Sequence, residues 1–275
     1  MSPAVAARLA VVGWGAIGLS RAPAPADGVE GPGVPPPSAS SAAYAQEAPY
    51  HSYDGSWTFV RVRTHGDYER LGRFRRRFRG YAGWSHDYPD AERNFSRILS
   101  EFTSVDVRLV ASGGNILTFE DPRIYRFPIA YVSEPDEWRT TAAEAAALRD
   151  YLLKGGFVIF DDFFEQEMGN LVRQMRRVFP ELDFLPLDGS EAIWGSFFAL
   201  EPLTIDLEGP RKHGIPRFWG LYMGNDKGRR MLAVAGAGAD IGDLWEWSDR
   251  GYFPVDPTNE AYRIGINYVI YALTH

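Results

Sequence analysis

The 275-residue chain contains no cysteine. This absence excludes disulfides, thiolate nucleophiles and cysteine-ligated zinc or iron–sulfur sites. A Gly-x-Ser-x-Gly elbow and a Gly-x-x-x-x-Gly-Lys phosphate loop are also missing. The five histidines are scattered without the spacing of a zinc motif, so zinc is not expected. Any chemistry must therefore come from other side chains.

Positive charge is in the minority, with 29 Lys and Arg against 36 Asp and Glu and a net charge of -7. A nucleic-acid partner is not expected, because such binding needs a basic surface. One basic stretch, residues 70–79, interrupts this balance. It is either a patch for nucleic acid or an anionic surface, or a solvated loop or helix face paired with the protein's own acids, and we favour the second interpretation.

The N-terminus lacks an apolar run long enough to span a bilayer, and no transmembrane span is expected in the folded domain. Residues 1–20 nevertheless resemble a signal peptide, and residues 21–55 form a disordered Pro/Ala/Ser-rich linker by composition. We therefore expect export to the periplasm or cell envelope; a cytoplasmic protein with a disordered tail is the alternative. Residues 56–275 are expected to form a single α/β domain.

The middle of the chain shows an αβ unit. Thr141 and Glu144 have the spacing of a capping box, and a helical face follows. Gly155 and Gly156 then precede Phe157–Phe160, a short apolar run typical of a strand buried on both sides. Further strands are predicted at 57–63, 105–110, 127–132 and 184–187, a hairpin at 218–223 and 230–235, and helices at about 90–102, 168–178 and from Thr258 or Asn259 to Leu273.

This order of elements implies parallel pairing with right-handed crossovers. The predicted fold is therefore an α/β three-layer sandwich with a mostly parallel central sheet.

Two groups of acids stand out as a candidate binding cluster: Asp161, Asp162, Asp240, Asp243 and Glu246. The first pair follows a buried strand, and ligands of open α/β sheets bind beyond the carboxyl ends of strands. If the groups converge, a compensating cation is required, either Ca²⁺ or Mg²⁺ or an arginine such as Arg263. Helix caps and separate salt bridges are the alternative, with Asp162 as the cap of the helix at 168–178.

Several separated motifs resemble the DUF4159 family of bacterial proteins: Asp87-Tyr-Pro with Ala91-Glu92 and Asn94, Gly155 to Asp162, Asp240 to Glu246, and Tyr262 to His275. The resemblance covers roughly residues 56–275. It implies a fold similar to the class I glutamine amidotransferase-like, or flavodoxin-like, domains, and members are often exported or form the soluble end of membrane proteins. Glutamine amidotransferase activity is excluded here, because its nucleophile is a cysteine.

The expected function is a non-catalytic binding or scaffolding domain of the bacterial cell envelope, with an envelope protein or polymer as partner and no cofactor beyond a Ca²⁺ or Mg²⁺ ion. The alternative is a metal-assisted hydrolase acting on a glycan or related envelope polymer. In that case Asp161, Asp162, Asp240 and Asp243 would serve as metal ligands or acid/base groups.

Overall fold

A seven-stranded sheet organises the computed structural model, which describes residues 48–66, 83–207 and 216–275. Its strand order is β2-β1-β3-β4-β7-β6-β5. The five strands from β2 to β7 pair in parallel, whereas β6 and β5 are antiparallel additions at one edge. The strands are β1 Val60–Val62, β2 Asn115–Leu117, β3 Ile129–Ser133, β4 Phe157–Phe163, β5 Phe184–Pro186, β6 Arg217–Tyr222 and β7 Met231–Ala237.

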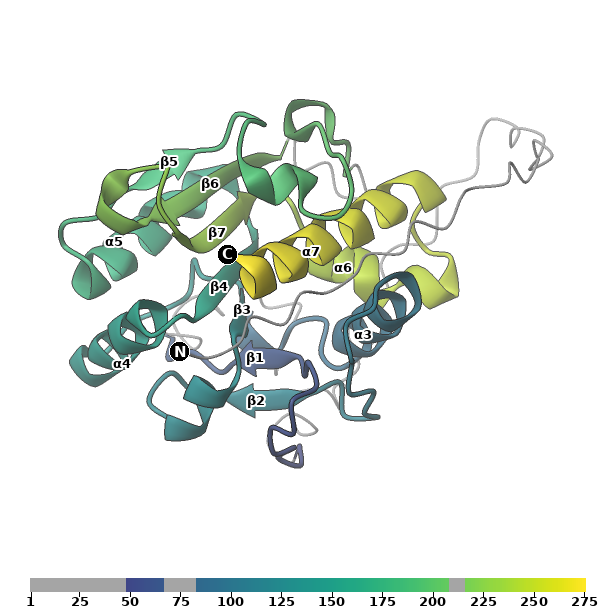
Figure 1. Ribbon diagram of the computed structural model, residues 1–275, viewed down its shortest axis with the longest axis horizontal. Coiled ribbons are helices and arrows are strands. Elements are labelled where there is room, and N and C mark those ends of the chain that lie inside the picture. Colours follow the sequence, from purple (N-terminus) through teal and green to yellow (C-terminus); the bar gives the residue numbers. More distant parts are fainter. Residues whose placement is uncertain (1–47, 67–82, 208–215) are drawn as a thin grey trace, which may run out of the picture. The chain divides into compact units, whose positions relative to one another are not determined.

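Helices cover both faces of the sheet (Figure 1). One face carries α3 Asp90–Phe102, α6 Ile241–Glu246 and α7 Val255–Thr274; the other carries α4 Ala142–Leu153 and α5 Met168–Val178. The 3-10 helices of the described residues are η1 Gly83–Ser85, η2 Pro122–Arg126, η3 Glu165–Glu167, η4 Ala192–Gly195, η5 Pro202–Thr204, η6 Met223–Asn225 and η7 Ser248–Arg250. The three-layer α/β architecture is thus confirmed, whereas the likeness to amidotransferase or flavodoxin domains stays a prediction.

The alternation of side chains along the sheet divides the interior into two cores. In β4, Ile159 packs into the core beneath α3, α6 and α7, and Phe160 packs into the core beneath α4 and α5. Both are nearly fully buried, as expected of a central strand covered on both faces. Within the described ranges, no helix is both long and apolar enough to cross a membrane.

Local signals in the sequence predicted most of the helices and strands correctly. Thr141 accepts a hydrogen bond from the backbone N–H of Glu144, whose carboxylate accepts one in return, so the predicted capping box begins α4. Gly155 closes the helix with φ of 110°, a conformation that favours glycine. The hairpin at β6 and β7 is also confirmed, whereas α7 begins earlier than predicted, at Val255.

The strand predicted at residues 105–110 is wrong. This segment makes one isolated parallel bridge, between Val107 and Trp57, and β1 pairs instead with β2. The alternation of apolar and polar residues at 105–110 belongs to a segment on the protein surface, where Leu109 is 57% exposed. A second correction concerns β4, which continues through Asp161 and Asp162 instead of ending before them.

Some predictions fall outside the described residues. These are the signal peptide at 1–20, most of the linker at 21–55 and the basic stretch at 70–79. The last linker residues do contact the domain: the backbone N–H of His51 donates to Asn115, and Tyr53 packs edge-on against Phe127.

Candidate metal centre

The carboxyl ends of β3, β4 and β7 meet the loop that precedes α3. Acidic residues from all four segments converge there with one histidine, which is the position where open α/β sheets bind ligands. We call this group the acidic cluster; it comprises His86, Asp87, Glu134, Asp161, Asp162, Asp240, Asp243 and Glu246.

A β-bulge in β4 separates the two neighbouring aspartates. Phe160 pairs with Ala235 and Phe163 with Ala237, so two residues of β4 stand opposite one residue of β7. The extra residue gives Asp162 a left-handed backbone, with φ of 59°. The bulge therefore re-aims Asp162, which in a regular strand would face away from Asp161.

Asp161 is tied into the fold. Its Oδ2 accepts hydrogen bonds from the Tyr131 hydroxyl at 2.6 Å and from the Gly242 backbone N–H at 3.0 Å, so it joins β3 and β4 to the start of α6. Burial raises the pKa of Asp161 to about 8, helped by the charge of Asp162 and opposed by these hydrogen bonds. The raised pKa favours the protonated form of Asp161, which acts as a structural acceptor.

Asp162 faces His86. Its Oδ2 lies 2.9 Å from Nδ1 of the imidazole and also accepts a hydrogen bond from Ser133 at 3.3 Å. Glu134 Oε1 lies 3.6 Å from the same Nδ1. These three side chains form the more open part of the cluster, with 12 to 18% of each side chain exposed.

Asp87 and Asp240 lie deeper, with exposures of 3% and 9%. Asp87 Oδ1 is 3.2 Å from His86 Nδ1, but in an orientation that makes no hydrogen bond. Within the described part of the chain, both oxygens of Asp87 and Oδ2 of Asp240 are buried without a hydrogen-bond donor. Asp240 Oδ1 caps α6 by accepting from the Asp243 N–H. Unsatisfied buried carboxylate oxygens are costly, so these oxygens have the capacity to bind a further donor or a cation.

The pKa values of the cluster also indicate that it can bind a cation. Burial and the neighbouring carboxylates raise the pKa of Asp87 and Asp240 well above the ordinary value, and raise the pKa of Glu246 to about 7. Burial alone would lower the pKa of His86, but the charge and hydrogen bond of Asp162 raise it well above 6.5. These raised pKa values favour protonated carboxyl groups, whose protons a bound cation would displace.

Three of these residues have strained backbone. Asp87, Glu134 and Asp162 have φ of 63°, 47° and 59°, in the left-handed region that few non-glycine residues occupy. Each lies in a different loop or bulge of the cluster. Strain of this kind persists where the surrounding structure fixes it, and it is concentrated at binding and catalytic sites.

A buried ion pair between Arg61 and Glu92 lies next to the cluster. Arg61 of β1 bonds through Nε to Glu92 of α3, donates through Nη1 to the Trp84 carbonyl at 3.1 Å, and lies 5.1 Å from the centre of the Tyr131 ring. Its charge also lowers the pKa of Asp87, although less than burial and the acids raise it.

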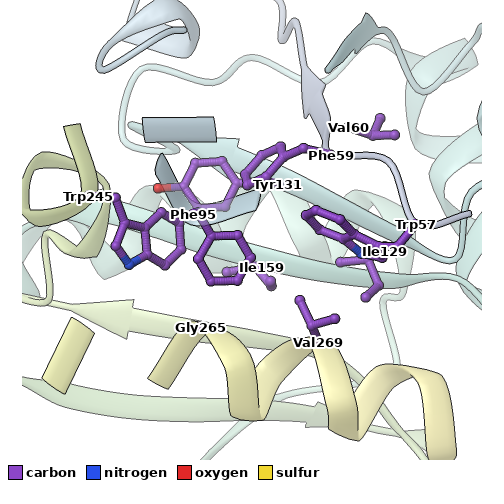
Figure 2. Close-up of a pocket in the computed structure, with 10 residues that line it drawn as sticks. All are labelled: Trp57, Phe59, Val60, Phe95, Ile129, Tyr131, Ile159, Trp245, Gly265 and Val269. Carbon is purple, nitrogen blue, oxygen red and sulfur yellow. The ribbon is translucent and has the colours of Figure 1, made fainter. Parts of the chain in front are cut away.

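Beside the cluster, a small apolar cavity of about 10 Å³ lies between the sheet and α3, α6 and α7. Figure 2 shows Tyr131 on its wall, with the hydroxyl on the side where Trp245 lies. At this size and with an aromatic lining, the cavity belongs to core packing. Gly265 permits the packing, because a Cβ there would lie 2.5 Å from the Trp245 ring and 2.6 Å from Phe95.

All five acids predicted from the sequence lie in this cluster. Asp162 does not cap α5, since that helix begins after Glu167 and Asp162 instead contacts His86. Arg263 is not the compensating cation: it pairs with Glu260 and donates to the Ala199 carbonyl.

The sequence interpretation missed His86, Asp87 and Glu134. His86 lacks the spacing of a zinc motif, and Asp87 belongs to a family motif without an assigned role, so neither residue signals a site in the sequence. A usable signal did exist for Glu134, since it is the second residue after the apolar run of β3, as Asp162 is the second residue after that of β4.

The fold and the cluster together define an α/β protein with a histidine–carboxylate site at the carboxyl edge of a mostly parallel sheet. A scan against protein families matches residues 59–273 to the domain of unknown function DUF4159. The chain belongs to this family, as its motifs predicted. No curated protein matches the chain.

Proposed function

We propose that the acidic cluster binds a divalent cation and that the protein is a metal-assisted hydrolase. The observation that carries the proposal is Asp87, a buried carboxylate without a hydrogen-bond donor among the described residues, aimed into a group of further ligands. Its possible co-ligands are within reach, because one ligand atom each from Asp87, Asp162 and Asp240 lie within 4.8 Å of one another. Such spacing suits donors around one ion.

The donor types fit a metal. Carboxylate oxygens suit Mg²⁺, Ca²⁺ and Mn²⁺, and the addition of an imidazole nitrogen extends the range to first-row transition metals. A bound cation would supply a polarised water or carbonyl for hydrolysis. Ser133 would orient the Asp162 carboxylate, and Asp161, which is held by Tyr131 and Gly242, would keep α6 against the site.

The rim of the cluster is open enough for a substrate. His86, Glu134 and Asp162 are partly exposed, whereas Asp87 and Asp240 lie beneath them. This gradient supports catalysis, since a purely structural ion needs no open side. A glycan or related envelope polymer, expected from the export-like N-terminus, is the substrate class we propose.

Calorimetry on the EDTA-treated full chain tests the proposal, with MnCl₂, MgCl₂, CaCl₂ and ZnCl₂ as titrants. We expect binding to the wild type and at least roughly tenfold weaker binding to Asp87→Asn, which keeps the shape and suits the left-handed backbone. Asp150→Asn is the matched control, because Asp150 is an exposed aspartate paired with Lys154. Equal binding by Asp87→Asn and the wild type would overturn the site.

Turnover is measured separately with dye-labelled peptidoglycan and p-nitrophenyl glycosides. Cation-dependent hydrolysis that is lost in Asp87→Asn supports the enzyme. Cation binding without turnover on either substrate overturns the proposed hydrolase and favours the non-catalytic binding domain expected from the sequence.

A further inference from the structure

The ligands of the acidic cluster fall into overlapping groups of three. Ligand atoms lie within 4.8 Å of one another in His86, Glu134 and Asp162, again in Asp87, Asp162 and Asp240, and again in His86, Asp87 and Asp243. The first two groups share Asp162 alone. We propose that the centre holds two divalent cations bridged by the Asp162 carboxylate, an inference that rests on the cation binding proposed above.

The outer and inner groups differ in depth. The outer group, His86, Glu134 and Asp162, is partly exposed, and Oδ2 of Asp162 already faces the imidazole at 2.9 Å. The inner group adds Asp87 and Asp240, whose exposures are 3% and 9% and whose orphaned oxygens point to a ligand of their own. A carboxylate has two oxygens, so Asp162 can serve the outer ion with one and the inner ion with the other.

One ion cannot use the whole set. Donors around a Mg²⁺, Mn²⁺ or Ca²⁺ ion stand about 2.0 to 2.6 Å from the metal, which limits the spread of the donors to about 4 to 5 Å. At about this limit the described ligands fall into overlapping groups of three, and no one group holds them all. Two ions about 3.5 to 4 Å apart, joined by a carboxylate, are the arrangement that two-metal hydrolases use to hold the attacking and leaving oxygens.

The two positions differ in chemistry. The outer group offers one nitrogen and two carboxylates, a set that suits Mn²⁺, Fe²⁺ or Zn²⁺. The inner group offers carboxylates only, which suits Mg²⁺, Ca²⁺ or Mn²⁺. Mn²⁺ fits both positions and is therefore the probe of choice.

The backbone supports Asp162 as the bridge. The β4 bulge holds it at φ of 59°, and the Ser133 hydroxyl donates to its Oδ2. Glu134 and Asp87, one from each group, show the same left-handed backbone, so the ligands of both positions are held by geometry that regular structure does not require.

The test counts Mn²⁺ ions bound to the full chain by calorimetry and by metal analysis after desalting. We expect about two ions in the wild type, about one in Glu134→Gln, about one in Asp240→Asn, and strong loss of both in Asp162→Asn. Low-temperature electron paramagnetic resonance should show a spin-coupled Mn²⁺ pair in the wild type and an isolated ion in Glu134→Gln. Circular dichroism verifies the fold of each variant, and Asp150→Asn again serves as the control.

The outcomes separate this inference from the function on which it rests. One ion in the wild type, lost alike in Glu134→Gln and Asp240→Asn, overturns the second position and leaves a mononuclear site. No bound ion in the wild type overturns both. Two ions in the wild type that persist in Asp162→Asn without spin coupling overturn the bridge.

Discussion

Asp161 and Asp162 are neighbours in β4, yet the first accepts hydrogen bonds from Tyr131 and Gly242 while the second lies 2.9 Å from the His86 imidazole. The bulge between Phe160 and Phe163 creates this division. One aspartate thus holds the fold together at the place where the other faces the proposed metal.

Substitution of each aspartate by asparagine should separate the two roles. Asp161→Asn keeps an acceptor for Tyr131 and Gly242, so its free energy of unfolding at neutral pH should fall by no more than about 1 kcal/mol below the wild-type value, with Mn²⁺ binding retained. Asp161→Ala leaves both donors buried and unpaired and should lose roughly 1–3 kcal/mol for each. Asp162→Asn should lose Mn²⁺ binding without loss of stability. Urea unfolding and calorimetry check these results, and loss of Mn²⁺ binding in a well-folded Asp161→Asn would contradict the division.

Without divalent cations, the protein should become less stable as the pH rises from about 5 to about 9. The folded-state pKa values of Asp161, about 8, and Glu246, about 7, exceed the value near 4 of an unfolded carboxyl group. The folded state therefore binds more protons, and the stability present below about pH 4 is lost as the pH rises through 7 to 8. His86 contributes with the same sign, because its pKa is also raised.

Urea unfolding in EDTA at about pH 5.5, 7 and 8.5 measures this trend. Asp161→Asn is the control, since it removes one titrating group and should flatten the curve. Saturating Mn²⁺ should reverse the trend, because the ligands must be deprotonated to bind. A rise in stability with pH in EDTA would show that the acids of the cluster are ionised without a metal.

Removal of one partner of the buried Arg61–Glu92 pair should be strongly destabilising. Glu92→Gln leaves the Arg61 charge without its counterion, and breaking such a pair typically costs about 3–5 kcal/mol. Arg61→Met combined with Glu92→Gln removes the isolated charge, so the double variant should unfold at a higher urea concentration than additivity predicts. Strict additivity would show that the pair contributes no coupling.

Two helical glycines should respond to alanine with opposite signs. Gly265→Ala drives a methyl group into the Trp245 and Phe95 rings and should lose about 1–3 kcal/mol. Gly169→Ala, in α5, meets only Arg173 Nη1 at 3.8 Å and should gain roughly 0.5–1 kcal/mol from helix propensity. Thermal unfolding measures both, and a stabilised Gly265→Ala would show that the rings can move aside.

The sequence predicted the sheet better than the site. The apolar run Phe157–Phe160, the capping box at Thr141 and the glycine pair Gly155–Gly156 are local signals, and all three are confirmed, with Gly155 as the residue of positive φ. The bulge that re-aims Asp162 depends on pairing with β7, more than 70 residues away in the chain, so no local pattern reveals it. His86 and Glu134 have no ligand spacing, because their partners come from other strands; only the topology brings them together.

The left-handed backbone at Asp87, Glu134 and Asp162 opposes folding at the same positions where the proposed ion would bind. Glycine adopts this conformation without strain, so replacing all three residues by glycine would relax the chain and remove the repelling carboxylates in one step. The triple variant should therefore be more stable than the wild type and unable to bind the proposed ion. Side chains kept in spite of such strain are what the proposed ion binding requires at these three positions.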